Sequence, residues 1–287
     1  MKNLKIINAD APIGGQLYSE LRILLLADVH FREDWYHWLA AQRADLAVIA
    51  GDLLDGFSPG GLLPQMLGLS VWCTRFPGNL AISSGNHDGN EPGGSFDPHG
   101  LEGLPENMRA GAVKMLQAKH WMDCLERPGL VTDGRTSRIQ TPSGEVIVST
   151  IPYNHWTHGD RLADQLWQEG QRLRSCCRAP WIVLHHEPPA DTTVGGPSGD
   201  PHLFYKIREY RPNFVVSGHL HDQPYRGGFA DEIEGTWCFN PGHPTPARAM
   251  QSKIPNHIVL DLSAGTATWH AIANVGRAPI IKQIHLT

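Results

Sequence analysis

The stretch from Leu21 to Asp52, LRILLLADVHFREDWYHWLAAQRADLAVIAGD, decides the fold class. Residues 21–27 and 46–50 are almost continuously apolar, which is typical of strands that are buried on both faces. Residues 33–44 carry tryptophans at helical spacing, which we interpret as core packing. A buried strand, a helix and a second buried strand predict a βαβ unit, and hence a parallel sheet with right-handed crossovers.

The same alternation of apolar runs and helical segments continues along the chain. Further strands are predicted at residues 80–83, 130–131, 137–140, 145–150, 181–184, 213–217, 237–240, 258–262 and 266–271. Further helices are predicted at residues 62–76, 112–125, 162–174 and 201–210. Because we find no repeat and no inter-domain linker, we expect residues 1–287 to form one α/β domain. We expect a sandwich in which each half of the chain supplies one sheet.

Residues 89–111 differ from the rest of the chain, because they are rich in Gly, Pro, Asn and Glu with only scattered apolar residues. A loop of this length is usually functional or disordered. It leaves the end of a predicted strand directly. We therefore expect an insertion that forms a lid or a wall of a substrate site.

Composition makes several classes of protein less favoured. The chain has 287 residues and a net charge of −5, so a nucleic-acid partner stays open but is not favoured. The five Cys lack CxxC spacing, which disfavours a disulfide framework and fits free thiols in a reducing cytoplasm. No segment resembles a signal peptide or a membrane-spanning helix. We expect a cytoplasmic protein with no membrane partner, and its oligomeric state stays open.

Five predicted strands end in residue types that bind metals. The five motifs are Asp28-Val29-His30, Gly51-Asp52, Gly85-Asn86-His87-Asp88, His185-His186-Glu187-Pro188 and Gly218-His219-Leu220-His221. The carboxyl ends of parallel strands meet at one edge of a sheet, where α/β proteins build their sites. Carboxylates, imidazoles and one amide oxygen suit Mn, Fe, Zn, Ni or Co better than Ca or Mg. We therefore predict two divalent transition-metal ions, with Mn favoured.

The spacing within the motifs predicts individual roles. In an extended strand residues i and i+2 point the same way, so Asp28 and His30 are expected to reach one ion. Asp52 follows a glycine that permits a sharp turn, so its carboxylate is predicted to bridge two ions. Two ions about 3.5–4 Å apart can hold a hydroxide between them and clamp the oxygens of a phosphoryl group. His87 could then protonate the leaving group or stabilise the charge of the transition state, and Asp55 could orient the His87 ring through its other N–H.

The order of these motifs resembles the calcineurin-like metallophosphoesterase family, whose pattern is D-x-H, G-D, G-N-H-D/E, a His near a Pro, and G-H-x-H. The segment Asn240-Pro241-Gly242 also resembles an element common after the last motif. The resemblance implies two mixed β-sheets packed as a sandwich and flanked by helices, with His87 as the catalytic histidine. It implies a first metal held by Asp28, His30, Asp52 and His221, and a second held by Asp52, Asn86, a His of the fourth motif and His219.

Some histidines stay ambiguous at this point. Family members often place the fourth-motif ligand two residues before a proline, which favours His186 but leaves His185 as an alternative. His155 and His158 are interpreted as residues of a solvated loop. Whether His243 approaches the metals stays open.

The resemblance also narrows the reaction. Protein Ser/Thr phosphatases of the family usually carry arginines where this chain has Gly56 and Ser84, and the G-N-H-D form resembles the phosphodiesterase and nuclease branches. This implies a metal-dependent phosphoric ester hydrolase that acts on a small phosphate ester, either a phosphodiester or a small nucleotide, by attack of a metal-bridging hydroxide. The alternatives are a nuclease of the repair-associated branch and a non-catalytic scaffold on the same fold.

Overall fold

The computed structural model describes residues 20–58, 61–88, 106–118, 120–153, 161–245, 249–250, 252–272 and 278–286. The strands of the first sheet are β1 (Arg22–Leu26), β2 (Leu46–Ala50), β3 (Asn79–Ser83), β4 (Leu130–Val131), β11 (His257–Asp261), β12 (Thr266–Ala271) and β13 (Ile280–His285). Those of the second sheet are β5 (Arg135–Thr141), β6 (Gly144–Thr150), β7 (Trp181–Leu184), β8 (Phe214–Val216), β9 (Ala230–Ile233) and β10 (Thr236–Phe239).

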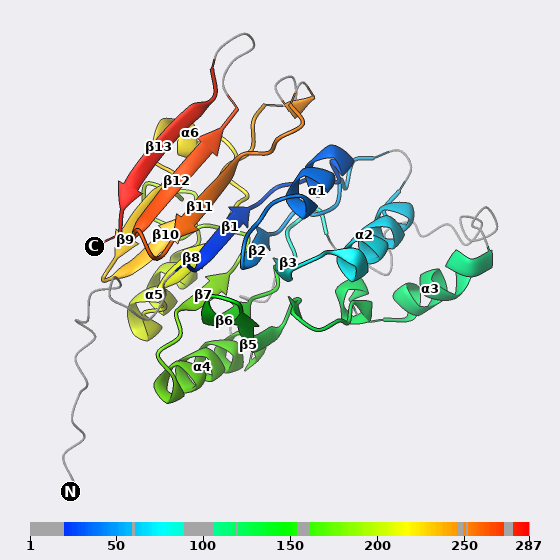
Figure 1. Ribbon diagram of the computed structural model, residues 1–287, viewed down its shortest axis with the longest axis horizontal. Coiled ribbons are helices and arrows are strands. Elements are labelled where there is room, and N and C mark those ends of the chain that lie inside the picture. Colours follow the sequence, from blue (N-terminus) through cyan, green and yellow to red (C-terminus); the bar gives the residue numbers. More distant parts are fainter. Residues whose placement is uncertain are drawn as a thin grey trace, which may run out of the picture.

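Helices flank both sheets (Figure 1). They are α1 (Glu33–Ala40), α2 (Leu63–Arg75), α3 (Glu106–Gln117), the 3-10 helix η2 (Trp121–Cys124), α4 (Arg161–Cys176), α5 (Pro201–Tyr210) and α6 (Gln223–Arg226). The first sheet has the order β13-β12-β11-β1-β2-β3-β4, and the second has the order β5-β6-β7-β8-β10-β9. Each sheet contains parallel and antiparallel pairs, so the prediction of two mixed sheets flanked by helices is confirmed.

The prediction that each half of the chain supplies one sheet is wrong. β11 pairs antiparallel with β1, with Leu260 opposite Ile23, so the C-terminal strands β11, β12 and β13 extend the first sheet. β4 also joins the first sheet, by parallel pairing with β3. Pairing between strands so far apart in the sequence depends on the whole folded chain and leaves no local pattern to read.

Side chains alternate in direction along the buried strands, so neighbouring residues of one strand pack in two different hydrophobic cores. In β1, Ile23 and Leu25 belong to the cluster between the two sheets. Leu24 and Leu26 belong to a separate cluster with residues of α1 and α2, and Trp35 of α1 is 1% exposed there. The near-continuous apolar run that predicted β1 therefore reflects burial on both faces.

β7 repeats this arrangement in the second sheet. Ile182 and Leu184 face the first sheet, whereas Trp181 and Val183 pack in a cluster with residues of α4 and α5. The molecule thus has four layers, with helices outside two sheets (Figure 1).

Several element boundaries differ from the sequence prediction. α3 begins at Glu106, so the end of the predicted loop 89–111 is helical. Residues 89–105 lie outside the described residues, and the lid or wall stays a prediction. The edge strands β9 and β13 were not predicted, because ADEI and IIKQIH carry charged or polar residues and lack a buried apolar run.

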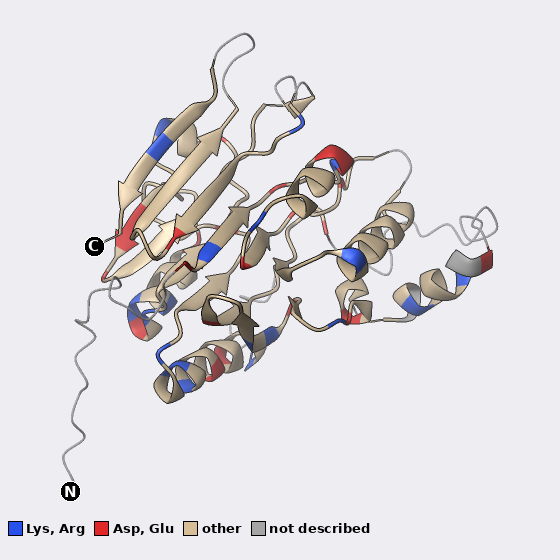
Figure 2. Ribbon diagram, in the orientation of Figure 1, with Lys and Arg blue, Asp and Glu red and all other residues tan. Residues whose placement is uncertain are grey.

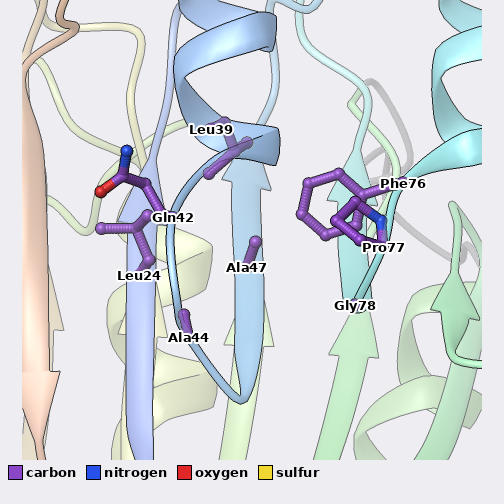
Figure 3. Close-up of a pocket in the computed structure, with 8 residues that line it drawn as sticks. All are labelled: Leu24, Leu39, Gln42, Ala44, Ala47, Phe76, Pro77 and Gly78. Atoms are coloured by element: carbon purple, nitrogen blue, oxygen red, sulfur yellow. The ribbon is translucent and has the colours of Figure 1, made fainter.

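The five strands that precede the predicted ligands are β1, β2, β3, β7 and β8. Within each sheet these strands run parallel, so their carboxyl ends share an edge. A pocket of about 130 Å³ lies toward the other end of the first sheet, where Ala44 and Gly78 precede β2 and β3 (Figure 3). None of the helices in the described ranges is long and apolar enough to cross a membrane.

Candidate metal centre

Four of the seven predicted ligands have left-handed rather than extended backbone. Asp28, His30, Asp52 and His219 have φ values of 54°, 46°, 50° and 63°. Such values are uncommon for residues other than glycine and concentrate at functional sites. Hydrogen bonds hold the first motif in this shape, because the N–H groups of Asp28 and His30 donate to Gly51 O (3.1 Å) and Asp52 O (2.9 Å). The extended alternation expected for this motif is therefore wrong, although both side chains do reach one cluster.

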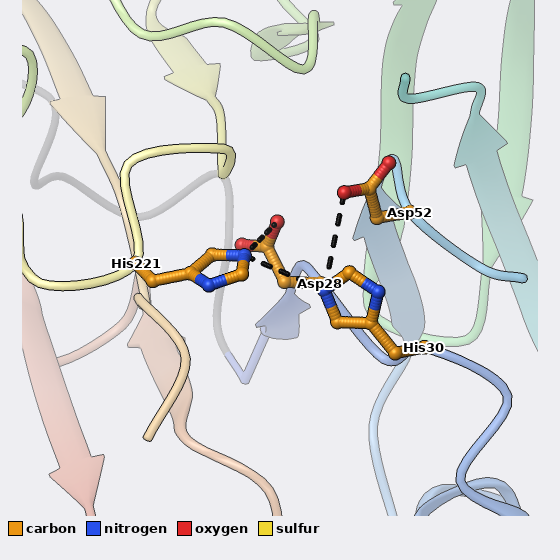
Figure 4. A group of neighbouring side chains, drawn as sticks. All are labelled: Asp28, His30, Asp52 and His221. Atoms are coloured by element: carbon orange, nitrogen blue, oxygen red, sulfur yellow. Dashed lines mark hydrogen bonds and ion pairs between the residues drawn. The ribbon is translucent and has the colours of Figure 1, made fainter. Parts of the chain in front are cut away.

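Asp28, His30, Asp52 and His221 form the first metal group (Figure 4). One ligand atom from each lies within 4.8 Å of those of the others. His221 Nε2 lies 3.3 Å from Asp28 Oδ1, and His30 Nε2 lies 3.9 Å from Asp52 Oδ2. Asp28 is fully buried, and its Oδ2 has no hydrogen-bond partner among the described residues. Burial raises the pKa of Asp28, but the nearby histidines outweigh it and hold that pKa below its usual value, so a charged carboxylate faces the group.

Asn86, His186 and His219 gather near Asp52 in a second cluster, which we name the second metal group because the family resemblance implies a metal there. Asn86 Oδ1 lies 3.0 Å from His186 Nε2 and 2.9 Å from His219 Nδ1. His186 Nε2 also lies 3.3 Å from Asp52 Oδ2. Asp52 Oδ2 therefore faces His30 of the first group and His186 of the second, which is the arrangement that a bridging carboxylate requires.

The tautomer of His186 shows that the second group suits a cation. His186 Nδ1 lies 2.9 Å from Ala50 O, so Nδ1 carries a proton and donates it. If the ring were neutral, the Nε2 lone pair would point at the oxygens of Asn86 and Asp52 and repel them. A positive charge at this position, either a proton or a metal ion, removes that repulsion. Burial lowers the pKa of His186, but its hydrogen bond to Asp52 and the charges of Asp52 and Asp28 prevail and raise it to about 9. A divalent ion would replace this proton and serve the same oxygens.

Three motif glycines leave space for ligands of other motifs. An added Cβ would lie 2.2 Å from His186 Nδ1 at Gly51, 2.3 Å from Asp52 Oδ1 at Gly85, and 2.6 Å from Asp28 Oδ2 at Gly218. All three distances are shorter than non-bonded atoms can approach. Each glycine is therefore required by the neighbour that packs against it, which explains why glycine stands before the ligands in these motifs.

Asp88 connects the second and third motifs. Its carboxylate accepts the N–H groups of Leu53 (3.1 Å), Leu54 (2.8 Å) and Gly85 (2.8 Å). Burial and the charge of Asp52 raise the pKa of Asp88 to about 8, although these hydrogen bonds act in the opposite direction. The residue fixes the position of the β2 end relative to the β3 end, and so of Asp52 relative to Asn86.

His87 lies beside the shared carboxylate, with Nε2 3.9 Å from Asp52 Oδ2. The expectation that Asp55 orients its ring is wrong. His87 Nδ1 accepts the N–H of Gly56 at 3.2 Å, whereas Asp55 Oδ1 accepts the N–H of Phe57 at 3.0 Å. A backbone donor therefore orients the ring, because the turn from Asp55 to Phe57 folds its own N–H toward His87.

His186, rather than His185, lies against Asp52 and Asn86. Side chains of successive residues alternate in direction, so His186 continues the face of Ile182 and Leu184 that points between the sheets. His185 points the other way, and its Nε2 lies 3.7 Å from Asp200 Oδ2. His185, Glu187 and Asp200 form a separate group whose ligand atoms are also close enough to hold a metal ion.

Further side chains surround the two groups. The ring of His243 lies 4.9 Å from that of His221, so this histidine does approach the site. Glu187 Oε1 lies 4.0 Å from His219 Nε2, and the ring of Tyr153 lies 5.7 Å from that of His186. Neither Glu187 nor Tyr153 was predicted to take part in the site. Glu187 stands inside the fourth motif and could have been suspected, whereas Tyr153 carries no signal. His155 and His158 lie outside the described residues.

A family model for calcineurin-like phosphoesterases matches residues 21–223, a range that contains all five motifs. The chain belongs to the calcineurin-like phosphoesterase family. Members of this family typically bind two divalent metal ions, and the Asp and His groups of this phosphoesterase are able to hold metal. No curated protein matches the chain.

Solved structures share the fold of this phosphoesterase. It is similar to the protein TT1561 of Thermus thermophilus, with 12% identity, a TM-score of 0.50, and coverage of 94% of this chain and 100% of the other. It is also similar to GAP50, described as the anchor in the inner membrane complex of Plasmodium, with 12% identity, a TM-score of 0.50, and coverage of 93% and 89%. At these identities the likeness shows the fold alone.

Proposed function

We propose that this phosphoesterase is a dinuclear metal-dependent hydrolase of a phosphodiester or a small nucleotide, acting in the cytoplasm. The observation that carries the proposal is the position of Asp52 Oδ2, 3.9 Å from His30 Nε2 and 3.3 Å from His186 Nε2. One carboxylate can therefore serve both metal groups. Two divalent ions held there would supply an activated water and neutralise charge on the phosphate oxygens. The five free cysteines fit a reducing compartment.

His87 is the candidate catalytic histidine. Because Nδ1 accepts the Gly56 N–H, a neutral His87 carries its proton on Nε2, the nitrogen that faces Asp52. A hydrogen bond donated from that atom can stabilise the negative charge that develops on the substrate oxygens as the ester bond breaks. The ring needs no rotation to donate this bond, since the backbone of Gly56 already sets its orientation.

The lack of a positively charged side chain at two positions supports a phosphodiester as the substrate. Protein Ser/Thr phosphatases of the family usually have arginines where this chain has Gly56 and Ser84. Ser84 is 4% exposed; its N–H donates to Asp133, and its hydroxyl accepts the N–H of Tyr153. Neither position presents a positive side chain to a substrate. A diester carries less negative charge than a monoester and has less need of one.

The two alternative functions, a nuclease and a non-catalytic scaffold, would require different features of the chain. A nuclease would be expected to carry a basic surface. The net charge is −5, and Lys and Arg are scattered among Asp and Glu over several elements (Figure 2). A non-catalytic scaffold has no need of converging metal ligands, whereas both groups here retain them.

The test uses protein stripped with a chelator and reloaded with Mn, Ni, Zn or Fe. The substrates are bis-p-nitrophenyl phosphate, p-nitrophenyl phosphate, cyclic nucleotides and a single-stranded oligonucleotide. We expect metal-dependent hydrolysis that favours the small diesters. His87→Ala should keep its metal content and lose about 10²–10³-fold in kcat, the usual contribution of one hydrogen-bond donor to a developing oxyanion. A protein that binds two ions and hydrolyses none of these esters would be a scaffold, and preference for the oligonucleotide would identify a nuclease.

A further inference from the structure

Phe57 is a solvent-exposed apolar side chain next to the candidate catalytic residue His87. It is 86% exposed, the highest value for a large apolar side chain in the part of the chain that the structure describes. Its ring lies 4.8 Å from the ring of His87, at an interplanar angle of 82°. The edge-on contact leaves a face of the Phe57 ring open. A single exposed apolar side chain is common on a protein surface, so the case for a function rests on the position of this ring beside His87.

The turn that carries Phe57 is fixed by hydrogen bonds to its backbone. Gln65 of α2 is 4% exposed, and its side chain bonds both ends of Asp55: Oε1 accepts the Asp55 N–H at 2.8 Å, and Nε2 donates to Asp55 O at 3.1 Å. The Asp55 carboxylate then accepts the N–H of Phe57 at 3.0 Å. The backbone of the turn is therefore held in place before any ligand binds. A preorganised ring loses little conformational entropy on binding, as a recognition surface requires.

We propose that Phe57 stacks on the base of a nucleotide whose phosphate is held at the two metal groups. The assignment rests on the proposed function. The ring of His87 neighbours both Phe57 and the shared carboxylate: its centroid is 4.8 Å from that of Phe57, and its Nε2 is 3.9 Å from Asp52 Oδ2. A nucleotide has the matching layout, because a ribose separates its phosphate from its planar base. Stacking on an aromatic ring accepts any base, so Phe57 selects for a base without selecting which one.

A mononucleotide fits better than a polymer. Binding of a nucleic-acid chain relies on Lys and Arg along its phosphates. The chain carries 24 Lys and Arg against 29 Asp and Glu, and its basic residues are spread over separate elements (Figure 2). One aromatic ring and one phosphate site recognise one nucleotide unit.

The test compares two ligands that differ only in the base. Adenosine 5′-monophosphate and ribose 5-phosphate are titrated into Mn-loaded protein by calorimetry. We expect wild-type protein to bind the nucleotide about tenfold more tightly, the size of effect that one stacked base produces. Phe57→Ala and Phe57→Leu should bring the ratio of the two Kd values close to one, because leucine keeps apolar area but has no flat face. Phe57→Trp should keep the preference.

Tyr205→Ala is the matched control, since Tyr205 is an aromatic residue of α5 that is 65% exposed. It should leave the ratio at its wild-type value. A wild-type ratio near one, or a ratio that Phe57→Ala does not change, overturns the proposal. A single-stranded oligonucleotide that binds more tightly than the nucleotide, with affinity falling steeply with salt, overturns the assignment to a mononucleotide. The ratio is measured by binding, so it can succeed or fail separately from hydrolysis.

Discussion

Gly85→Ala tests whether the motif glycines exist to make room for ligands. An alanine Cβ at this position would lie 2.3 Å from Asp52 Oδ1 and 2.4 Å from Asp52 N. Gly85 does not have a positive φ, so alanine is acceptable to its backbone and the effect arises from space alone. The Asp52 N–H belongs to the backbone at the end of β2 and cannot yield as a flexible side chain would. Asp52 must therefore move, together with its hydrogen bond of 2.9 Å from the His87 N–H.

The expected magnitude follows from this clash. Overpacking by one methyl group in a rigid site costs about 1–3 kcal/mol. For a chain of this size that lowers Tm by about 2–10 °C. Displacement of a shared ligand should also weaken metal binding by more than about tenfold, since Asp52 belongs to both groups and a shift near 1 Å is costly.

The assay separates the two effects. Thermal unfolding is followed with chelator present, which reports stability without metal, and Mn binding is then measured by calorimetry. Gly78→Ala is the control, because Gly78 precedes the same strand and an added Cβ there would meet Phe76 Cε1 at 3.6 Å and Ala44 O at 4.0 Å, both ordinary contacts. It should leave Tm and metal affinity near wild type. If Gly85→Ala matches Gly78→Ala in both measurements, the explanation of the motif glycines is refuted.

Two further substitutions test the charge and the titration of the protein. Asp52→Asn should remove at least one ion, because an amide cannot supply the negative charge that both groups share; two ions at full occupancy by elemental analysis would refute the bridging role. Burial lowers the pKa of His257 from 6.5 to about 4, so between these values the unfolded chain binds a proton that the folded chain does not. Stability should then fall as pH drops from 6.5 toward 4, with His257 contributing at most about 1.4 kcal/mol per pH unit. His257→Phe should show a shallower decline in urea unfolding with chelator present, and an unchanged slope would contradict this.

Local sequence patterns were sufficient to predict the strands around the site and the residue types of the candidate ligands. A strand buried on both faces must be apolar along its length, so β1, β2 and β7 are recognisable from their sequences, and the polar residue that ends each run stands out. The order of five such endings is also local information. It was enough to indicate a metal centre of the calcineurin-like type, which the family match from residue 21 to 223 supports.

Local sequence patterns were not sufficient to predict which strands belong to which sheet. β11 reaches β1 only when the intervening chain has folded, and its sequence would suit either sheet. The edge strands β9 and β13 have one side free of partner strands and tolerate polar residues, so they lack the signature that identified the central strands.

The tertiary structure alone decided the detailed geometry of the site. His185 and His186 are the same residue type one position apart, and only the packing of β7 against the first sheet selects which one faces Asn86 and Asp52. The left-handed backbone of Asp28 and His30 depends on hydrogen bonds from the neighbouring motif, so extended geometry was the wrong premise for them. A backbone N–H rather than Asp55 contacts the His87 ring, because the turn that carries Asp55 is shaped by Gln65 of another element. The sequence by itself determined which chemical groups stand at the strand ends, since burial dictates where apolar runs stop. Which of those groups meet, and at which atoms, was decided by contacts between segments that are distant in the chain.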